Sequence, residues 1–297
     1  MNILTFDIEE WYIEKVYNGG RAKQYRQYND YLARILDLLD QYGIKATFFC
    51  VGGMATDFPN IVRQITAKGH EVGCHSNTHQ WLNKMTREEA LEDTRMAVDA
   101  LEQLIGQKVV SYRAPAFSIG EKNKWAFEVL AECGIECDAS IFPASRDFGG
   151  FPQFKEHVPT LVNYQGVTIK EFPIPTTKLL GKELAYSGGG YFRFFPLWFI
   201  KSRMKKSDYN MCYFHIGDLL PGPKRVMTKA EYEEYFREPG TFINRYKRYL
   251  KASLGRNEVF EKMEKLVSSD SFVGLCQSEK MIDWEKAPKV KLPDSRP

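Results

Sequence analysis

The chain has 297 residues, of which 43% are hydrophobic and 27% are charged, as in ordinary globular proteins. Its net charge of +3 is too small to predict nucleic acid or an anionic membrane as a partner. No stretch approaches the roughly 18 uncharged apolar residues of a spanning helix, so we expect no integral membrane segment. The length could hold two average domains, but α/β barrels of roughly 200 to 250 residues or more often form one.

The N-terminus and the cysteines favour a cytoplasmic protein. The chain enters a strand-like run at once, without the basic region and apolar stretch of a signal peptide. The cysteines are scattered, mostly within apolar runs, which favours reduced, buried thiols over a disulfide framework. Cys133 and Cys137 resemble half of a metal site, but no second half accompanies them.

Strand and helix patterns alternate through the first half of the chain. Apolar runs predict buried strands, while apolar residues at helical spacing, followed by Gly43, Gly69 or Gly106, predict helices. Thr86 and Glu89 form a capping box. In chain order we expect a strand at Ile3–Ile8, a helix at Asn29–Tyr42, a strand at Ala46–Val51, a helix at Pro59–Lys68, a strand at Glu71–Cys74, a helix between Thr86 and Gly106, a strand at Val109–Tyr112, a helix from about Lys122 to Cys133, and a strand at Ile135–Ser140.

A segment rich in Pro, Gly and aromatic residues, from Phe142 to Phe195, interrupts this alternation. It contains a predicted hairpin of Leu161–Tyr164 and Val167–Phe172 around Gln165-Gly166. Beyond it we expect a strand at Met211–Phe214, helices within Lys229–Leu250 and Asn257–Val267, and a short strand at Phe272–Leu275. Strands joined by crossover helices predict an α/β fold with mainly parallel strands. We therefore expect one barrel-like catalytic domain over residues 1–283 and a disordered tail over 284–297.

Polar residues gather just after several predicted strands. At the carboxyl ends of parallel strands such residues meet at one edge, which is where α/β barrels build their active sites. Asp7 and Glu9 end the first strand, His75 and His79 follow the third, Arg113 follows the fourth, Asp138 lies on the fifth, and His215 follows the strand at Met211–Phe214.

His75 and His79 lie four residues apart and would point the same way if their segment turned helically. Two imidazoles with one carboxylate from Asp7-Ile8-Glu9 would hold one divalent metal and leave positions open for water and substrate. Such an open site is catalytic rather than structural.

Five motifs in order resemble the polysaccharide deacetylases, a family of metal-dependent carbohydrate esterases with a distorted (β/α) barrel. They are Thr5-Phe-Asp-Ile-Glu-Glu-Trp11, His75-Ser-Asn-Thr-His79, Arg113-Ala-Pro-Ala-Phe-Ser118, Cys137-Asp-Ala-Ser-Ile-Phe-Pro143 and Tyr213-Phe-His215. The stretches Glu171-Phe-Pro and Gly188-Gly-Gly-Tyr-Phe-Arg193 further resemble a branch linked to exopolysaccharide and surface-glycan synthesis.

This resemblance implies a role for each residue. Asp7 would be the general base, held by Arg113, and His215 would be the general acid, with Asp138 as its partner. His75 and His79 would bind the metal, most often zinc, with cobalt, nickel or manganese as alternatives. The backbone N–H near Ala116 would stabilise the oxyanion. The family's first motif usually has a second Asp where Ile8 stands. The related Asp-x-acid pattern points to Glu9 as the carboxylate ligand, and Glu10 is the alternative.

We expect aromatic and glycine-rich residues to complete the substrate site. Trp11 and Tyr191 could equally stack on sugar rings or pack in the core, and Arg193 lies in the same run as Tyr191. Gly189 and its neighbours would form a mobile loop over the cleft or a tight turn. The predicted activity is removal of N-acetyl groups from an amino sugar of a polysaccharide, or of a lipid- or nucleotide-linked precursor. The alternatives are a hydrolase of small non-sugar amides and a catalytically silent sugar-binding protein.

Overall fold

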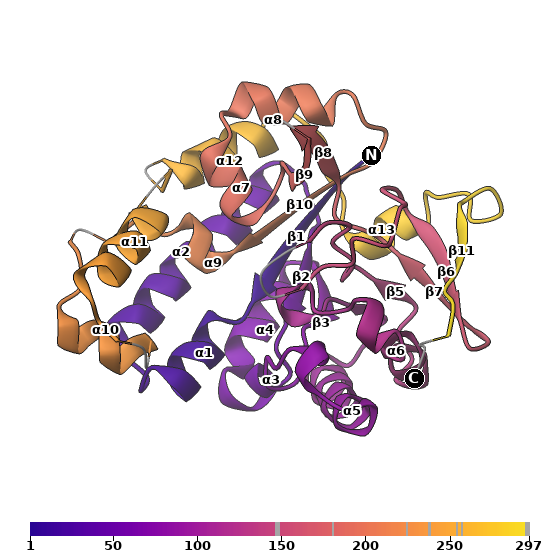
Figure 1. The fold of residues 1–297 in the computed structure, drawn as a ribbon, viewed down its shortest axis with the longest axis horizontal. Helices are drawn as coiled ribbons and strands as arrows, with labels where there is room; N and C mark the ends of the chain where they lie inside the picture. Colours follow the sequence, from indigo (N-terminus) through magenta and orange to yellow (C-terminus); the bar gives the residue numbers. More distant parts are fainter. Residues whose placement is uncertain are drawn as a thin grey trace.

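A nine-stranded sheet organises the chain (Figure 1). The computed structural model describes residues 1–145, 149–179, 181–223, 225–236, 239–253, 255–256 and 258–294. The strand order is β10-β1-β2-β3-β4-β5-β7-β6-β11, and β8 and β9 form a separate hairpin. The strands are β1 Asn2–Ile8, β2 Thr47–Cys50, β3 Glu71–Cys74, β4 Ser111–Tyr112, β5 Cys137–Asp138, β6 Thr160–Tyr164, β7 Val167–Glu171, β8 Thr176–Leu179, β9 Lys182–Ala185, β10 Asn210–His215 and β11 Lys289–Lys291.

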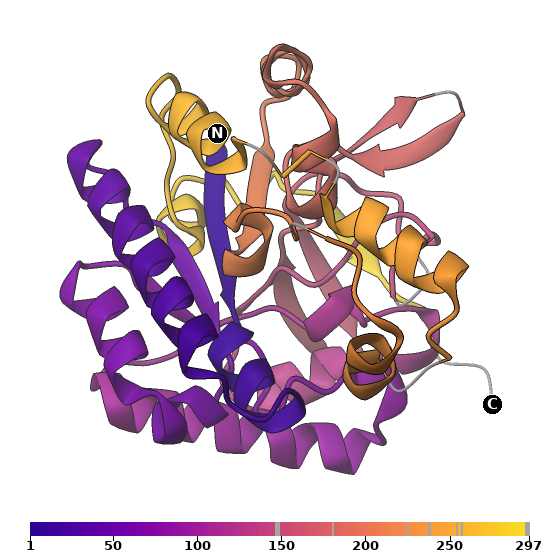
Figure 2. The ribbon, with the colours of Figure 1, turned by 90° about the vertical axis from the view of Figure 1, so that its left-hand side faces the viewer.

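Helices surround this sheet, and Figure 2 shows those of the N-terminal half, in indigo to purple, forming an outer layer around the strands. The helices are α1 Glu10–Tyr17, α2 Ala22–Gln41, α3 Gly53–Asp57, α4 Pro59–Ala67, α5 Arg87–Ile105, α6 Ala126–Glu132, α7 Gly189–Phe194, α8 Leu197–Met204, α9 Ile216–Leu219, α10 Lys229–Phe236, α11 Phe242–Ser253, α12 Val259–Val267 and α13 Leu275–Glu279. Of the described helices, none is long and apolar enough to cross a membrane.

The predicted α/β fold with mainly parallel strands is confirmed. Among the paired neighbours in the described sheet, only β6 and β7 run antiparallel, around the predicted Gln165-Gly166 turn. Arg113, just after β4, contacts Met211 on β10, although β1, β2 and β3 lie between these strands. The sheet is therefore curved strongly enough for its two halves to face each other. The pairing of the described strands still has two ends, so the hydrogen bonds do not close a ring.

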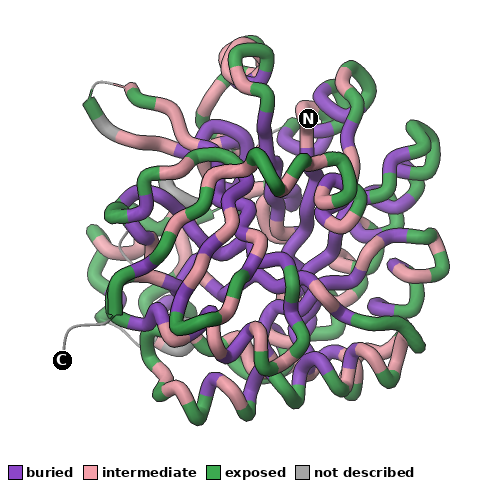
Figure 3. Tube along the Cα trace, turned by 90° about the vertical axis from the view of Figure 1, so that its right-hand side faces the viewer, coloured by how far each residue is buried: buried purple, intermediate pink, exposed green. Residues whose placement is uncertain are grey.

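Strand β1, which contains Asp7 and is followed by Glu9, lies in the centre of the fold. It pairs in parallel with β2 on one side and β10 on the other, and positions 3 to 8 are all buried. Parallel strands covered on both faces read as continuous apolar runs, which is why Ile3–Ile8 was recognisable. Figure 3 shows the same distribution, with buried positions along the inner strands and alternating burial along the outer helices.

Two predicted elements near the C-terminus differ from the structure. The expected strand Phe272–Leu275 is reduced to a single bridge between Ile3 and Val273, because the chain turns into α13 at Leu275. The expected helical segment Lys229–Leu250 forms two helices, α10 and α11, on either side of Pro239-Gly240. Residues 237–238 of this prediction, and Asn257 of the next, lie outside the described residues.

The segment 284–297 was expected to be a disordered tail, and this is wrong for residues 284–294. Lys289–Lys291 forms β11, which pairs in parallel with β6 and covers an edge of the sheet that would otherwise be open. The Leu292 N–H donates to the Asn163 carbonyl at 2.9 Å, and the Leu292 side chain is buried. Charge and proline content suggested disorder, but edge pairing and one buried leucine outweigh them. Residues 295–297 lie outside the described residues.

Leu292→Ala tests this correction. We expect a loss of about 2–5 kcal/mol in the free energy of unfolding, because a buried leucine is removed. Lys291→Ala is the matched control, since Lys291 is exposed and should change stability by less than about 0.5 kcal/mol. Urea unfolding followed by circular dichroism measures both. Equal stability of the two variants would support a disordered tail instead.

Candidate active site

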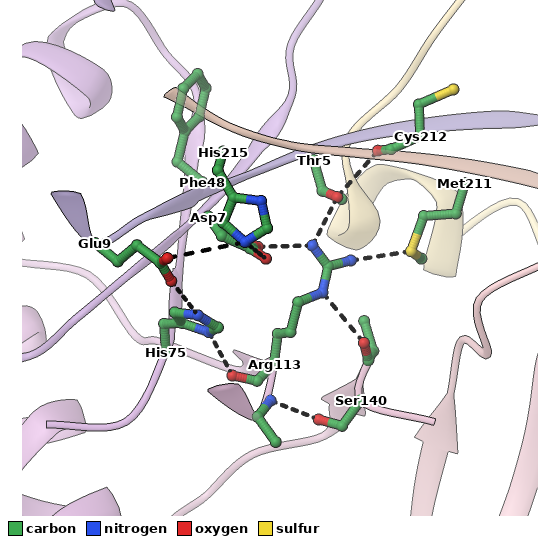
Figure 4. A network of polar contacts seen from close by, with 12 residues as sticks. Thr5, Asp7, Glu9, Phe48, His75, Arg113, Ser140, Met211, Cys212 and His215 are labelled. Atoms are coloured by element: carbon green, nitrogen blue, oxygen red, sulfur yellow. Dashed lines mark hydrogen bonds and ion pairs between the residues drawn. The ribbon is translucent and has the colours of Figure 1, made fainter. Parts of the chain in front are cut away.

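Three side chains that could hold a metal ion converge at the carboxyl edge of the sheet. Figure 4 shows two of them, Glu9 and His75. Glu9 follows β1, His75 follows β3, and His79 lies in the loop beyond. Glu9 Oε2 lies 3.2 Å from His75 Nε2 and 2.7 Å from His79 Nε2. All three ligand atoms lie within 4.8 Å of one another. The structure therefore brings together the three residues that were predicted as metal ligands.

The loop that carries the two histidines is not helical, contrary to the simplest interpretation of their spacing. Ser76 and His79 both have left-handed backbone conformations, with φ of 61° and 58°. Asp93 on α5 stabilises this loop, since its carboxylate accepts bonds from the N–H groups of Asn77 and Thr78 at 2.7 and 3.2 Å. A tight turn, anchored from the neighbouring helix, thus places the two imidazoles side by side.

A hydrogen bond to the backbone of Arg113 fixes the orientation of the His75 ring. Its Nδ1 lies 2.7 Å from the Arg113 carbonyl oxygen, which can only accept, so Nδ1 carries the hydrogen and Nε2 presents its lone pair to the cluster. Burial acts to raise the pKa of Glu9, but the positive charges of His79 and His215 hold this pKa well below its ordinary value. The carboxylate is therefore ionised, as a metal ligand must be.

The donor set fits a divalent cation. It consists of one carboxylate oxygen and two imidazole nitrogens, which are the ligands that zinc uses at catalytic sites with open positions. A single oxygen of the Glu9 carboxylate contacts both imidazole rings, of which His75 is buried and His79 is half-buried. Glu9, His75 and His79 would hold such a cation.

Glu10, the alternative carboxylate, points elsewhere. It begins α1, and its Oε1 accepts a hydrogen bond from the Gly217 N–H at 2.5 Å. Burial and the neighbouring charge of Glu9 raise the pKa of Glu10 to about 7. A carboxyl that accepts from the backbone of α9 joins two segments of the site rather than adding a metal ligand.

Asp7 and Arg113 form a buried ion pair beside the cluster. Arg113 Nη1 donates to Asp7 Oδ1 at 2.8 Å, and both side chains are almost fully buried. The same nitrogen donates to Thr5 Oγ1, also at 2.8 Å, and Nε donates to the Ala139 carbonyl at 3.2 Å. These contacts leave Asp7 Oδ2 facing the site, where it lies 3.7 Å from His215 Nε2.

The partner of His215 is Asp218, which sequence reasoning missed. Asp218 Oδ2 lies 2.9 Å from His215 Nδ1 and accepts from the His215 backbone N–H at 3.3 Å. Asp218 lies in the first turn of α9, so a capping residue three positions after a histidine was the available signal. Although burial opposes it, the negative charges of Glu9, Asp218 and Asp7 raise the pKa of His215 well above its ordinary value. This imidazole is therefore protonated in the metal-free protein.

Asp138 was predicted to partner His215, and its contacts show this to be wrong. Its Oδ1 accepts a hydrogen bond from Ser140, and its neighbour is Glu171 at the end of β7. Burial raises the pKa of Asp138 to about 6, and burial together with the charge of Asp138 raises the pKa of Glu171 well above its ordinary value. The positive charge of Arg113 opposes the rise in both pKa values, so the charges that act on Asp138 are those of Glu171 and Arg113 rather than that of His215.

Trp11 cannot stack on a sugar ring as expected. Its side chain is 1% exposed, its Nε1 donates to Asn29 at 2.8 Å, and its ring packs edge-on against Tyr28 of α2. The adjacent Glu10 begins a helix, which turns the indole toward α2 and away from the strand edge.

The glycine run packs tightly instead of forming a mobile loop. A Cβ at Gly188 would lie 2.2 Å from the Tyr213 ring, and Gly189 has a φ of +50°. These glycines allow α7 to approach β10 two residues before His215. Replacing all three glycines with alanine would therefore disturb the catalytic strand itself.

The roles of the other predicted substrate contacts stay predictions. Ala116 has a left-handed backbone with φ of 55°. Tyr191 is half-buried and its ring stacks on Phe142. It lines a cavity of about 670 Å³ whose described walls all come from residues 143–191, within the predicted insertion. The Arg193 guanidinium lies 3.7 Å from Asp218 Oδ1.

Comparisons with known proteins match two segments of the chain. Residues 3–137 match the family model described as polysaccharide deacetylase, and residues 139–277 match a domain of unknown function (DUF3473). A peptidoglycan-N-acetylglucosamine deacetylase from Bacillus cereus is 37% identical over 100 residues, which cover 33% of this chain and 36% of that protein. A chitooligosaccharide deacetylase from Bradyrhizobium is 30% identical over 97 residues, which cover 33% of this chain and 42% of that protein. The chain thus spans less than half the length of these two relatives.

Solved structures support the fold. A candidate polysaccharide deacetylase from Mycobacterium smegmatis aligns with a TM-score of 0.64 at 17% identity, covering 99% of this chain and 93% of that one. A 4-α-glucanotransferase from Thermococcus litoralis aligns with a TM-score of 0.57 at 15% identity, covering 99% of this chain and 42% of that one. At these identities the likeness concerns the fold alone. The family match and the relatives above therefore place residues 3–137 of the chain in the polysaccharide deacetylase family.

Proposed function

We propose that this chain is a metal-dependent hydrolase that removes N-acetyl groups from an amino sugar of a polysaccharide or of its biosynthetic precursor. The observation that carries the proposal is the meeting of three separately held groups at one strand edge. A metal-ligand cluster of Glu9, His75 and His79 lies beside Asp7, which Arg113 holds, and His215, which Asp218 holds. Amide hydrolysis needs an activated water, a base and an acid, and this edge has residues for each.

The proposed chemistry divides among these residues. A divalent cation at the cluster, most simply zinc, supplies a lowered pKa for water and a polarised carbonyl. Asp7 takes the proton of the attacking water at Oδ2, the oxygen that Arg113 leaves free. His215 donates the proton at Nε2 to the departing sugar amine, while Asp218 stabilises the imidazolium through Nδ1. The Ala116 N–H is the proposed donor to the oxyanion.

The cellular setting is part of the same proposal. We assign the reaction to the cytoplasm and to surface-glycan synthesis, with a lipid- or nucleotide-linked glycan as a possible substrate. All six cysteines are free thiols, which is the usual state in a reducing compartment. The printed activities of the relatives concern N-acetylglucosamine in peptidoglycan and chitooligosaccharides, and they support an N-acetylated glycan as the substrate class.

A matched pair of glutamate variants tests the metal site. Glu9→Gln should weaken zinc binding at least about tenfold, because it removes the anionic ligand between two imidazoles. Glu10→Gln, one residue along the chain, should bind zinc as the parent protein does. Competition titration against a zinc chelator dye measures both affinities. If Glu10→Gln lost zinc and Glu9→Gln kept it, the ligand assignment would be reversed.

Asp7→Asn and His215→Ala separate an enzyme from a silent sugar-binding protein. Each should lower kcat by about 10²–10⁴, the usual effect of one positioned proton carrier, while zinc remains bound. The double variant should be little worse than either single variant, because groups that act together are not additive. Acetate release from N-acetylated sugars, with glycan binding measured in parallel, gives the readout. A parent protein that binds glycans, but releases no acetate with any divalent metal, would be a sugar-binding protein.

Asp218→Asn tests the partner of the acid. His215 works in its protonated form, so activity should fall as the pH rises through its pKa. Removing the negative charge of Asp218 lowers that pKa. The basic limb of the pH profile of kcat should therefore move to lower pH, with the acidic limb little changed. Asp283→Asn, an exposed carboxyl variant, should leave both limbs in place. An unchanged basic limb in Asp218→Asn would contradict this assignment.

A further inference from the structure

A cavity of about 510 Å³ between α2, α11 and the chain after α9 is lined by arginines. We call it the arginine pocket, after Arg193, Arg225, Arg245, Arg248 and Arg256. Among its described lining residues there is no aspartate or glutamate. A concentration of positive charge in a concave site predicts an anionic ligand.

Arg193 is the member closest to the catalytic centre, and its charge is only partly balanced. Its side chain is 9% exposed, yet Nε and Nη1 are buried without a hydrogen-bond acceptor in the described structure. The only ion-pair partner described for it is Asp218, at 3.7 Å. Asp218 lies closer to His215, at 2.9 Å, and so serves two cations at once. A buried guanidinium with free donors is costly unless an anion satisfies it.

Two further arginines of the pocket form no ion pair among the described residues. Arg256 Nε is buried without an acceptor, and burial and the charge of Arg193 lower the pKa of Arg256, which the charge of Asp218 only partly offsets. Arg245 donates through Nε and Nη1 to the carbonyls of Gly240 and Met227, at 3.1 and 2.9 Å. These carbonyls fix the guanidinium in place without cancelling its charge. Arg225 differs, because Glu231 pairs with it at 2.6 and 2.8 Å.

The number and spread of the guanidinium groups favour a phosphate ligand over a carboxylate. One carboxylate satisfies one arginine fork, whereas a diphosphate carries more charge and many acceptor oxygens in several directions. The position of the pocket agrees. Asp218 links Arg193 to His215, the group that faces the departing amine. In a 2-acetamido sugar this amine is on C2, next to the anomeric carbon that carries the phosphate in a glycosyl diphosphate.

We propose that the arginine pocket binds the diphosphate of a glycosyl diphosphate whose N-acetylated sugar lies at the strand edge. This inference rests on the proposed function, since it places the sugar by its leaving amine. The diphosphate can come from a nucleotide sugar or from a polyprenyl-linked sugar, and both share the group that the arginines contact. The diphosphate acts only in binding here, so no bond to phosphorus forms or breaks.

Direct binding tests the pocket without the reaction. Inorganic pyrophosphate is titrated calorimetrically into the metal-free protein, so that the ion cannot bind through a metal. The parent protein should bind it, and Arg256→Gln and Arg245→Gln should each weaken binding by about ten- to a hundredfold, the usual effect of a charged hydrogen bond. Arg26→Gln, an exposed variant on α2 outside the pocket, should bind as the parent does. Thermal melts check that each variant is folded. Absent binding, or binding that neither pocket variant weakens, overturns the proposal.

Kinetics then separate this inference from the proposed function. Acetate release is compared for a uridine diphosphate-linked N-acetylhexosamine, a polyprenyl diphosphate-linked one and the free sugar. The ratio of kcat/KM for a diphosphate-linked sugar to that for the free sugar should fall about ten- to a hundredfold in Arg256→Gln. The better of the two linked substrates identifies the source. If the sugars are deacetylated but this kcat/KM ratio is unchanged in Arg256→Gln, the proposed diphosphate site is overturned and the proposed deacetylase activity is not. Arginine-dependent pyrophosphate binding without acetate release from any substrate supports the pocket and overturns the deacetylase.

Discussion

The buried ion pair between Arg113 and Asp7 is the constraint on which the site depends. Arg113 reaches across the curved sheet to Asp7 and Thr5 on β1 and Met211 on β10, and its guanidinium lies 4.4 Å from the ring centre of Phe49 on β2. An isolated guanidinium could not be buried at this depth, so Asp7 and its oxygen-bearing neighbours are needed together. The Arg113 carbonyl also orients His75. One residue thus sets the positions of the proposed base and of a proposed metal ligand.

Most of the catalytic edge could be predicted because parallel strands place their carboxyl ends together. Glu9, His75 and Arg113 each follow a buried apolar run, and such runs are easily recognised. The register between β1 and β10 brings Asp7 and His215 together, because the two residues lie directly opposite each other in this strand pair. The pairing of β1 with a strand so distant in the chain is invisible to local patterns. The ordered motifs implied only that Asp7 and His215 act at one site.

What could not be predicted depends on local backbone geometry or on packing between distant segments. The left-handed residues at Ser76 and His79 bring the imidazoles together by a route that spacing does not distinguish from a helical turn. Asp218 belongs to a one-turn helix too short to leave a periodic pattern. Trp11 looked equally suitable for a core or for a sugar platform, and only the position of α2 decides between them. The pairing of β11 with β6 likewise depends on the position of β6 at the edge of the folded sheet.

The central position of β1 has a consequence for how the protein is made. Thr5 on β1 donates to the Cys212 carbonyl on β10, a contact that spans 207 residues of chain. At the usual rate of synthesis, about 5–20 residues per second, β10 is synthesised roughly 10–40 s after β1. Glu9, His75 and His79 have left the ribosome long before then, whereas His215 and Asp218 arrive with β10 and α9. The proposed metal ligands are therefore synthesised first, and the proposed proton donor joins them only when β10 docks.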